Sequence, residues 1–443
     1  MSIRIITKAP GPLTAPANKP VLAVRDRLRE GALTAVGAAK VSISTVADII
    51  EGVAKRGNDA VIACTKDYDT FALTPDRLRV SQEDIDKAHS EASEDFLALI
   101  RRAAANIRKY QESIRVQAPD PLIRDGRELS VRYTPIGRVG VYVPGGRAIY
   151  PSTVLMTVVP AQVAGVKEIA MVSPPTGKGD IDPTVLALAG ELGVGEVYRV
   201  GGAQAIAALA FGTETIGAVD KIVGPGNAFV TEAKRQVMGR VGIDSIAGPS
   251  EVLIVADDTA RPDWVAADMW AQAEHNPGSA VLVTPSKALA EAVKAAVENV
   301  PDDLVRAGAI RECLDAYGAI IVVPDLEAAC AVANDFAAEH LQIITADDEA
   351  ALGRISNAGA IFLGPHTPVP LGDYYAGPSH VLPTGGTARF FGPLSCNDFL
   401  KATSVVRYDA AALSEDADDV IDFATREGLT AHARAIEIRR KEN

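Results

Sequence analysis

The sequence predicts an α/β protein with two Rossmann-like units, each built on a parallel sheet. Two observations support this fold class. Short β-rich runs alternate with Ala-rich helical stretches after residue 137, and the alternation occurs in two successive series. Strands that alternate with crossover helices at this spacing are typical of parallel sheets. Because the break between the series falls near residue 249, we expect the first unit at 138–249 and the second at 250–393.

The strands of both series are expected in short runs rich in Val and Ile, each followed by a helical segment. In the first series the strands are expected at 138–143, 168–173, 196–200 and 221–224, with helices starting at Tyr150, Pro183, Ala203 and Asn227. In the second series the strands are expected at 251–256, 280–284, 319–323, 341–345 and 360–363, with helices starting at Pro262, Lys287 and Leu326 and one more before the last strand.

Helical segments flank the two units. Residues 1–137 carry apolar residues at helical spacing behind capping residues, which predicts a helical N-terminal region. Residues 394–443 are expected to form a helical tail of two helices divided by Gly428, with Ser414 as a cap of the first. A Gly/Pro-rich stretch from Gly364 has no periodicity. We expect it to be a functional loop, because long irregular segments in compact domains usually are.

Composition excludes several classes of function. The chain has 443 residues, of which 48% are hydrophobic and 23% charged, so it is long enough for two or three globular domains. A net charge of −13 argues against binding to nucleic acid or an anionic membrane, since both need a basic face. No apolar run is long enough for a signal peptide or a membrane span, so we expect a soluble, cytoplasmic protein. The four cysteines lack CxxC spacing, and any metal is therefore expected on His, carboxylate or amide ligands.

Three Gly-rich turns each follow an expected strand and open a helix: VPGG (143–146), VGGAQA (200–205) and VGPGNAF (223–229). This arrangement directs backbone N–H groups towards a phosphate. None of the three spells GxGxxG, and each alone is explained as well by a tight strand-to-helix turn. Three such turns in one sheet favour a crevice for a dinucleotide or a phosphate.

Polar residues in the second unit suggest a metal and an acid-base pair. Gln272 and His275 project from one face near the end of the helix that Pro262 opens, and Asp373 lies in the Gly-flanked loop. They are candidate ligands of Zn²⁺, with Mn²⁺ or Co²⁺ as substitutes, although a polar helix end and a turn-forming Asp explain them too. Glu339 and His340 precede a strand and suit general acid-base chemistry, the alternative being a surface Glu and a core His.

Eight segments of the chain occur in the order in which one known family has them: YVPGGRAIYPSTVLMTVVPAQVAGVKEI, VGGAQAIAALAFGTETI, KIVGPGNAFVTEAKR, DSIAGPSEVLIVAD, AQAEHNPGSAVLVT, AAEHLQI, GDYYAGPSHVLPT and EGLTAHARAI. Through these segments the chain resembles histidinol dehydrogenases from roughly residue 40 to residue 440. The resemblance implies a homodimer of two Rossmann-like domains with tail segments exchanged between subunits. It also implies an NAD-dependent oxidation of an alcohol through an aldehyde to a carboxylate, assisted by one zinc.

The resemblance also implies a role for individual residues. Glu427 and His432 would be supplied by the partner chain. In the implied reaction His340 takes the hydroxyl proton and Glu339 activates water on the aldehyde. The implied zinc ligands are Gln272, His275, Asp373 and His432; the acid-base pair is Glu339 and His340; the NAD contacts are Tyr142, Gln204 and Asn227; and the substrate contacts are Ser250, His380 and Glu427 together with the zinc ligands and His340.

Three departures from the family pattern fall on substrate-side segments. Val369 stands where the family places a glutamate close to its cationic substrate, Tyr110 and Gln111 replace a Phe-His pair, and FGPLS (391–395) replaces a Ser-rich stretch. Leaving a buried cation without its partner costs on the order of a few kcal/mol. We therefore expect a non-cationic primary alcohol, such as the 2,3-dihydroxypropane-1-sulfonate used by the sulfopropanediol dehydrogenases of this family. The alternative is L-histidinol.

Other residues could contact the substrate, but the sequence does not decide their role. Arg147 and Arg389 are candidates for binding an anion, although members that use histidinol can carry arginines there as well. Cys396 is the only thiol near this region, and an inert buried cysteine explains it better.

Overall fold

Two parallel sheets form the body of the protein in the computed structural model, which describes residues 3–38, 43–145, 150–177, 179–275 and 278–440. The sheets have the strand orders β6-β5-β4-β7-β8 and β1-β11-β10-β9-β12-β13. This confirms the α/β class with parallel sheets. Their strands are β1 (Arg4–Thr7), β4 (Arg138–Tyr142), β5 (Glu168–Ser173), β6 (Val197–Arg199), β7 (Lys221–Val223), β8 (Gly242–Ile243), β9 (Ser250–Ala256), β10 (Gly278–Thr284), β11 (Ala319–Val322), β12 (His340–Ile344) and β13 (Ala360–Leu363).

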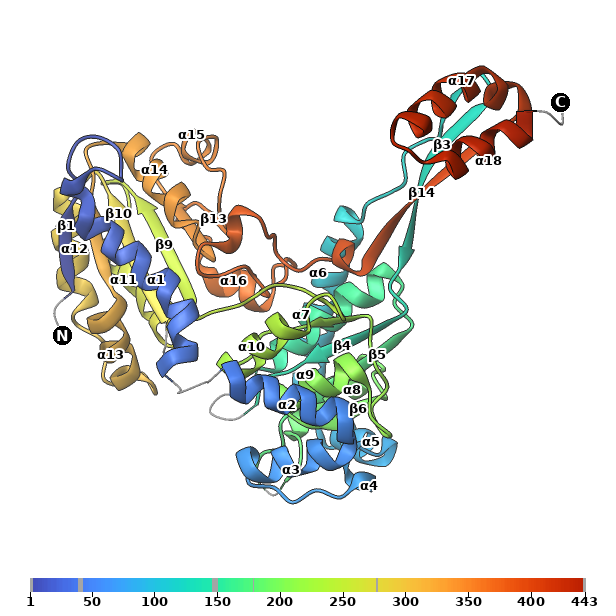
Figure 1. Ribbon diagram of the computed structural model, residues 1–443. Helices are drawn as coiled ribbons and strands as arrows, with labels where there is room; N and C mark the ends of the chain where they lie inside the picture. Colours follow the sequence, from blue (N-terminus) through green and yellow to red (C-terminus); the bar gives the residue numbers. More distant parts are fainter. Residues whose placement is uncertain (1–2, 39–42, 146–149, 178, 276–277, 441–443) are drawn as a thin grey trace.

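Helices cover both faces of the five-stranded sheet (Figure 1). Side chains alternate between the faces of a strand, so Val141 in β4 faces one helical layer while its neighbour Tyr142 faces the other. The first layer comprises α5 (Gln82–Glu91), α6 (Glu94–Ile114), α7 (Pro151–Ala164) and α8 (Pro183–Glu191), and the second comprises α2 (Ile43–Arg56), α3 (Asn58–Asp69), α9 (Gly202–Phe211) and α10 (Ala228–Val237), with the short α4 (Pro75–Leu78) between α3 and α5.

The six-stranded sheet is enclosed in the same way. Strand β9 turns Val252 and Ile254 towards one helical layer, and Leu253 and Val255 towards the other. The first layer comprises α11 (Pro262–Ala273), α12 (Lys287–Val297), α13 (Ala307–Tyr317) and part of α16 (Val369–Tyr374), and the second comprises α1 (Lys19–Ala38), α14 (Leu326–Phe336) and α15 (Asp348–Leu352).

Strands occur in two places where the sequence predicts helices alone. β1, near the amino terminus, pairs in parallel with β11 at the edge of the second sheet. β2 (Leu122–Arg124) and β3 (Arg127–Pro135) lie within the region 1–137, and β14 (Leu400–Tyr408) lies within the tail 394–443. The three form a separate antiparallel sheet, β14-β3-β2.

The antiparallel sheet extends as an arm away from both parallel-sheet units, with α17 (Ala410–Arg426) and α18 (Thr430–Arg440) at its tip (Figure 1). Asp409, and not Ser414, caps α17, because its carboxylate accepts the N–H of Ala412. Ser414 lies inside the helix. Leu122, Ile123, Val406 and Phe423 leave 63–73% of their surface exposed on this arm.

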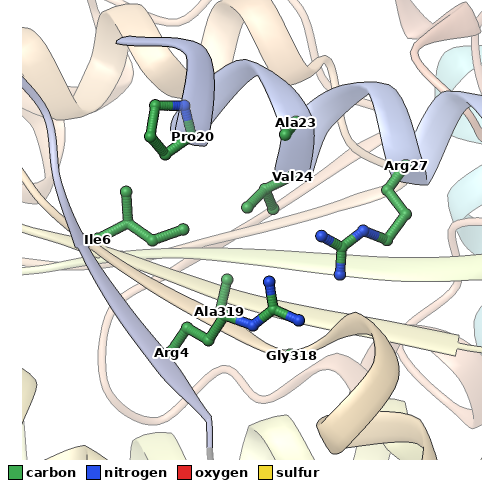
Figure 2. A pocket seen from close by; sticks show the side chains of 8 residues that line it. All are labelled: Arg4, Ile6, Pro20, Ala23, Val24, Arg27, Gly318 and Ala319. Carbon is green, nitrogen blue, oxygen red and sulfur yellow. The ribbon is translucent and has the colours of Figure 1, made fainter. Parts of the chain in front are cut away.

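A small cavity of about 170 Å³ lies between α1, the edge strand β1 and its neighbour β11 (Figure 2). None of its lining residues is a candidate site residue. They are Arg4, Ile6, Pro20, Ala23, Val24, Arg27, Gly318 and Ala319. Among the described residues, no helix combines the length and the apolar character that crossing a membrane requires.

Candidate active site

The starts of β9 and β12 bring Ser250, Glu339 and His340 together. These strands are parallel neighbours, with His340 in register with Val252. The Glu339 carboxylate accepts the Ser250 hydroxyl at 2.5 Å and the Glu251 N–H at 2.9 Å. Glu339 is buried, and the two donors hold its carboxylate in one orientation.

The hydrogen bonds of His340 assign its tautomer. Nδ1 lies 3.1 Å from the carbonyl oxygen of Glu251, so Nδ1 carries the proton that it donates. Nε2 lies 3.6 Å from a carboxylate oxygen of Asp373 and has no hydrogen-bond partner among the described residues. In the neutral ring Nε2 is thus the basic nitrogen, and it points to the side of the predicted metal ligand.

Burial and neighbouring charges compete over the protonation of this pair. Burial raises the pKa of Glu339 above its ordinary range. Burial alone would lower the pKa of His340, but the charges of Glu339 and Asp373 outweigh it and raise this pKa to about 9. The pKa of Asp373 is lowered, because its contact with His340 outweighs the opposing effect of burial.

Three of the four predicted zinc ligands lie at this cluster. Gln272 is 2% exposed in the last turn of α11, and both atoms of its amide lack a partner among the described residues. His275 follows the end of that helix. Burial lowers the pKa of His275, which favours the neutral form that binds metals. The nearby charge of Asp373 opposes this effect, and that of His340 adds to it. A buried amide without partners is unfavourable unless something binds it.

His432, the fourth predicted ligand, does not reach the cluster in a single chain. It lies exposed on α18 at the tip of the arm, and the predicted substrate contact Glu427 is exposed at the end of α17 (Figure 1). Accordingly, the described residues of one chain hold no group of three His, Cys, Asp or Glu side chains that could bind a metal.

His380 connects the cluster to the first unit. Its Nδ1–H donates to the carbonyl of Asp373 at 3.1 Å, and its Nε2 lies 3.4 Å from the Thr153 hydroxyl on α7. Burial lowers the pKa of His380, which favours a neutral ring. The structure therefore brings this predicted substrate contact to the same place as the acid-base pair. Asp373 itself lies in α16, a short helix within the segment expected to be a loop.

The predicted NAD contacts lie at the carboxyl end of the first sheet. The Tyr142 hydroxyl accepts the N–H of Gly202 at 3.1 Å, which joins the end of β4 to the start of α9. The Gln204 amide donates to Asp69 at 3.2 Å. Asn227 caps α10 by accepting the N–H groups of residues 229 and 230. Two helix starts thus flank the end of β4, and such starts bind phosphate groups.

The residues that depart from the family pattern take different positions. Val369 is buried in the same apolar cluster as Phe362, while Tyr110 packs closely against Gly377. Gln111 is fully buried and accepts the backbone N–H of Cys396 at 2.8 Å.

The remaining candidate substrate contacts are Cys396, the FGPLS segment, Arg389 and Arg147. Burial raises the pKa of the Cys396 thiol, as an inert cysteine requires. Leu394, in the FGPLS segment, donates its N–H to the carbonyl of Val381, next to His380. Arg389 pairs with Asp335, and Arg147 lies outside the described residues.

Two acidic residues near these sites, one buried and one half-buried, were not identified from the sequence. Glu251 stands at the start of a strand, where a polar residue is ordinarily taken as a boundary, although it is 3% exposed. Asp69 ends a helix that has no motif of its own. A carboxylate next to a run of apolar strand residues is the signal that could have identified Glu251, since acidic residues are rarely buried without a partner.

Comparisons with known proteins agree with this geometry. A sequence profile described as histidinol dehydrogenase matches residues 35–440. A histidinol dehydrogenase of Rhodopirellula baltica is 50% identical over 416 residues, covering 94% of this chain and 90% of its own. One from Geobacillus kaustophilus is 51% identical over 395 residues, covering 89% and 93%. The crystal structure of histidinol dehydrogenase from Elizabethkingia anophelis superposes with a TM-score of 0.88 at 32% identity, covering 99% of this chain and 98% of its own.

Fold and comparisons together define the class as an α/β oxidoreductase that acts on a CH–OH group. The chain belongs to the histidinol dehydrogenase family. The relatives named above are histidinol dehydrogenases, so they support the alternative substrate, L-histidinol, and give no support to the sulfonated diol.

Proposed function

We propose that this protein is a zinc- and NAD-dependent dehydrogenase that oxidises L-histidinol through the aldehyde to the carboxylate. The observation that carries the proposal is the arrangement around His340: a basic Nε2 without a hydrogen-bond partner, beside a fixed Glu339 carboxylate. The relatives at about 50% identity support histidinol as the alcohol.

The residues present fit the two cofactors. The partnerless amide of Gln272, the neutral ring of His275 and the carboxylate of Asp373 offer nitrogen and oxygen donors that suit Zn²⁺. The helix starts beside Tyr142 and Asn227 fit the phosphates of NAD. When bound, zinc supplies a cation that orients the alcohol, and NAD supplies the hydride acceptor.

The mechanism requires one base and one water-activating group. His340 must first release the proton that its raised pKa favours. In the neutral form its Nε2 takes the hydroxyl proton while hydride leaves the carbon, which gives the aldehyde. Glu339 then takes a proton from the water that adds to the aldehyde carbon, and a second hydride leaves to give the carboxylate. Each alcohol therefore yields two NADH. A base must lie within hydrogen-bond reach of the proton it removes, and burial, which raises the pKa of Glu339, makes this carboxylate a stronger base.

A dimer would complete the site. The arm carries His432 and Glu427 away from the cluster of its own chain, and it exposes large apolar side chains that a partner subunit could cover. We therefore place these two residues in the partner's site, where His432 supplies the fourth zinc ligand and Glu427 contacts the substrate.

A non-cationic alcohol is a second candidate, which the position of Val369 favours. This side chain is 6% exposed within an apolar cluster, and an apolar residue gives no charge to balance the amine of histidinol. An anionic alcohol such as 2,3-dihydroxypropane-1-sulfonate has no such requirement.

Parallel assays decide between the two substrates. The zinc-loaded enzyme is given NAD with L-histidinol or with 2,3-dihydroxypropane-1-sulfonate, and NADH formation is followed. We expect two NADH per histidinol; turnover of the sulfonate alone would replace histidinol by the second candidate, and turnover of neither would contradict the proposal. Val369→Glu, with Val369→Ile as its matched control, should raise kcat/KM for histidinol about 10-fold or more only if residue 369 faces the amine.

A further inference from the structure

Glu251 connects the acid-base pair to the segment that follows His380. Its Oε1 accepts the backbone N–H of Glu339 at 3.2 Å and that of Gly385 at 3.0 Å. Its own backbone N–H donates to the Glu339 carboxylate at 2.9 Å, and its carbonyl accepts Nδ1–H of His340 at 3.1 Å. Glu251 and Glu339 thus form a reciprocal clasp, in which the carboxylate of each accepts the N–H of the other.

The clasp is not explained by packing of the sheet. The remaining residues of β9 after Glu251 are apolar and fully or nearly fully buried, and an apolar residue at position 251 would continue that core. Burying a carboxyl group is unfavourable unless its oxygens are hydrogen-bonded. Both donors that satisfy Glu251 come from the reactive region: one is the main chain of Glu339, and the other is Gly385, five residues after His380.

We propose that Glu251 is a positioning residue that holds the Glu339 carboxylate in place for the second oxidation and fixes His340 in the tautomer needed for the first. This inference rests on the proposed function of Glu339 and His340. Within the described residues, Glu251 forms no hydrogen bond or ion pair with the proposed metal ligands, so it acts through the clasp and not through the zinc site.

The two functions of the clasp depend on different parts of Glu251. His340 binds the backbone carbonyl, which every substitution retains. The N–H groups of Glu339 and Gly385 bind the side-chain carboxylate, which substitution removes. Loss of the side chain should therefore disturb Glu339, and with it the second oxidation, far more than the first.

The protonation of the clasp supports this assignment. Burial, and then the charge of Glu339, raise the pKa of Glu251 to about 8, while burial raises that of Glu339. The titratable groups facing Glu251 are Glu339 and His340, and Asp373 faces Glu339 in turn. Two buried carboxyls that interact this closely titrate as a pair, so a change at Glu251 also changes the titration of Glu339.

The test compares Glu251→Gln and Glu251→Ala in the zinc-loaded, full-length enzyme. Glutamine keeps an oxygen that accepts both N–H groups, whereas alanine leaves both without a partner. The two oxidations are measured separately in single turnovers, with the alcohol that the wild type oxidises and with the corresponding aldehyde. We expect Glu251→Ala to slow aldehyde oxidation about 100-fold and alcohol oxidation less than 10-fold. Glu251→Gln should keep both rates within about 3-fold at pH 7. Loss of the Glu251 proton above about pH 8 should slow aldehyde oxidation by the wild type, and Glu251→Gln should lack this decrease.

Asp257 offers a matched control at the opposite end of the same two strands. Its carboxylate accepts the N–H of Ala346 at 2.8 Å and so joins the end of β9 to the end of β12. Asp257→Ala should lower stability without changing the ratio of the two rates. The zinc content of each purified variant, together with its NAD binding measured by calorimetry, shows whether that variant is folded. Should Glu251→Ala fail to fold, Glu251→Asp replaces it, because its shorter side chain cannot reach both N–H groups.

Equal slowing of both oxidations by Glu251→Ala, or no slowing of either, would overturn the proposal. A wild type that oxidises neither test alcohol would instead contradict the proposed function itself, so the two failures are distinguishable.

Discussion

At the scale of single residues, the half-buried carboxyl group of Asp69 should make the stability of the protein depend on pH. Asp69 receives a hydrogen bond from Gln204, which favours its charged form, but burial outweighs this bond and raises its pKa from 3.8 to about 6. The folded state therefore binds the proton more tightly than the unfolded state. The stability that the protonated Asp69 contributes is fully present below about pH 4 and is lost as the pH rises through about 6.

Asp69→Asn should therefore stabilise the protein at neutral pH. Two pKa units correspond to about 3 kcal/mol, and the partial exposure of Asp69 reduces the expected gain to about 1–2 kcal/mol. Urea unfolding at pH 7.5 and pH 4.5 measures it, and the gain should shrink at the lower pH. Asp67→Asn, at an exposed position of the same helix, is the control and should change little at either pH. An equal gain at both pH values would show that charge burial is not the cause.

The sequence identifies single residues well where a family motif carries them. The positions of Gln272 and His275 follow from helical spacing, and the structure confirms that both lie at the end of the helix that starts at Pro262. The function proposed for Glu251 could not be predicted from the sequence, because it depends on hydrogen bonds to residues 88 and 134 positions away.

At the scale of elements, the Gly-rich turn after β7 depends on close backbone contact. Gly224 has φ +110°, and a Cβ there would lie 2.2 Å from the carbonyl oxygen of Tyr142. Its N–H donates to Asp244 at 2.7 Å, and its carbonyl accepts the ammonium of Lys234 at 3.0 Å. The turn is thus fixed by a buried ion pair and by the absence of a side chain.

Gly224→Ala should disturb both stability and the expected NAD site. The strained φ and the contact with Tyr142 together predict a loss of about 2–4 kcal/mol in urea unfolding. Calorimetry should show weaker NAD binding as well. The control is Gly239→Ala, which has φ +98° but nothing within 4 Å of the added Cβ, and should cost only about 1 kcal/mol and leave NAD binding unchanged. Equal effects of the two substitutions would show that contact with Tyr142 is unimportant.

Helices and strands could be predicted where a buried face imposes a regular pattern of apolar residues. Most strands and helices of the two parallel sheets follow from apolar runs and caps, and α8, α11, α12 and α14 start at the expected residues, whereas β1 was not expected. β3 and β14 were missed because most of their residues are only partly buried or exposed, so their sequences lack a clear apolar alternation. α16 is six residues long, too short to show a helical period.

At the scale of the whole molecule, the proposed zinc site depends on the arm, because the arm carries the predicted fourth ligand. The site cluster lies in the body of the chain, and His432 lies at the tip of the arm (Figure 1). Intrachain ion pairs, such as those from Arg127 to Glu415 and Asp416, hold the tip helices to the arm's own sheet. The exposed apolar side chains of the arm fit the proposal that a partner subunit covers them.

The most direct test of this account uses two inactive variants in one dimer. His340→Asn removes the proposed base from the body, and His432→Asn removes the proposed zinc ligand from the arm. Each homodimer should be inactive. If the arm completes the partner's site, a mixed dimer places both defects in one site and leaves the other intact, so the purified heterodimer should form NADH from the alcohol at about half the wild-type rate. A heterodimer as inactive as its parents would contradict the account.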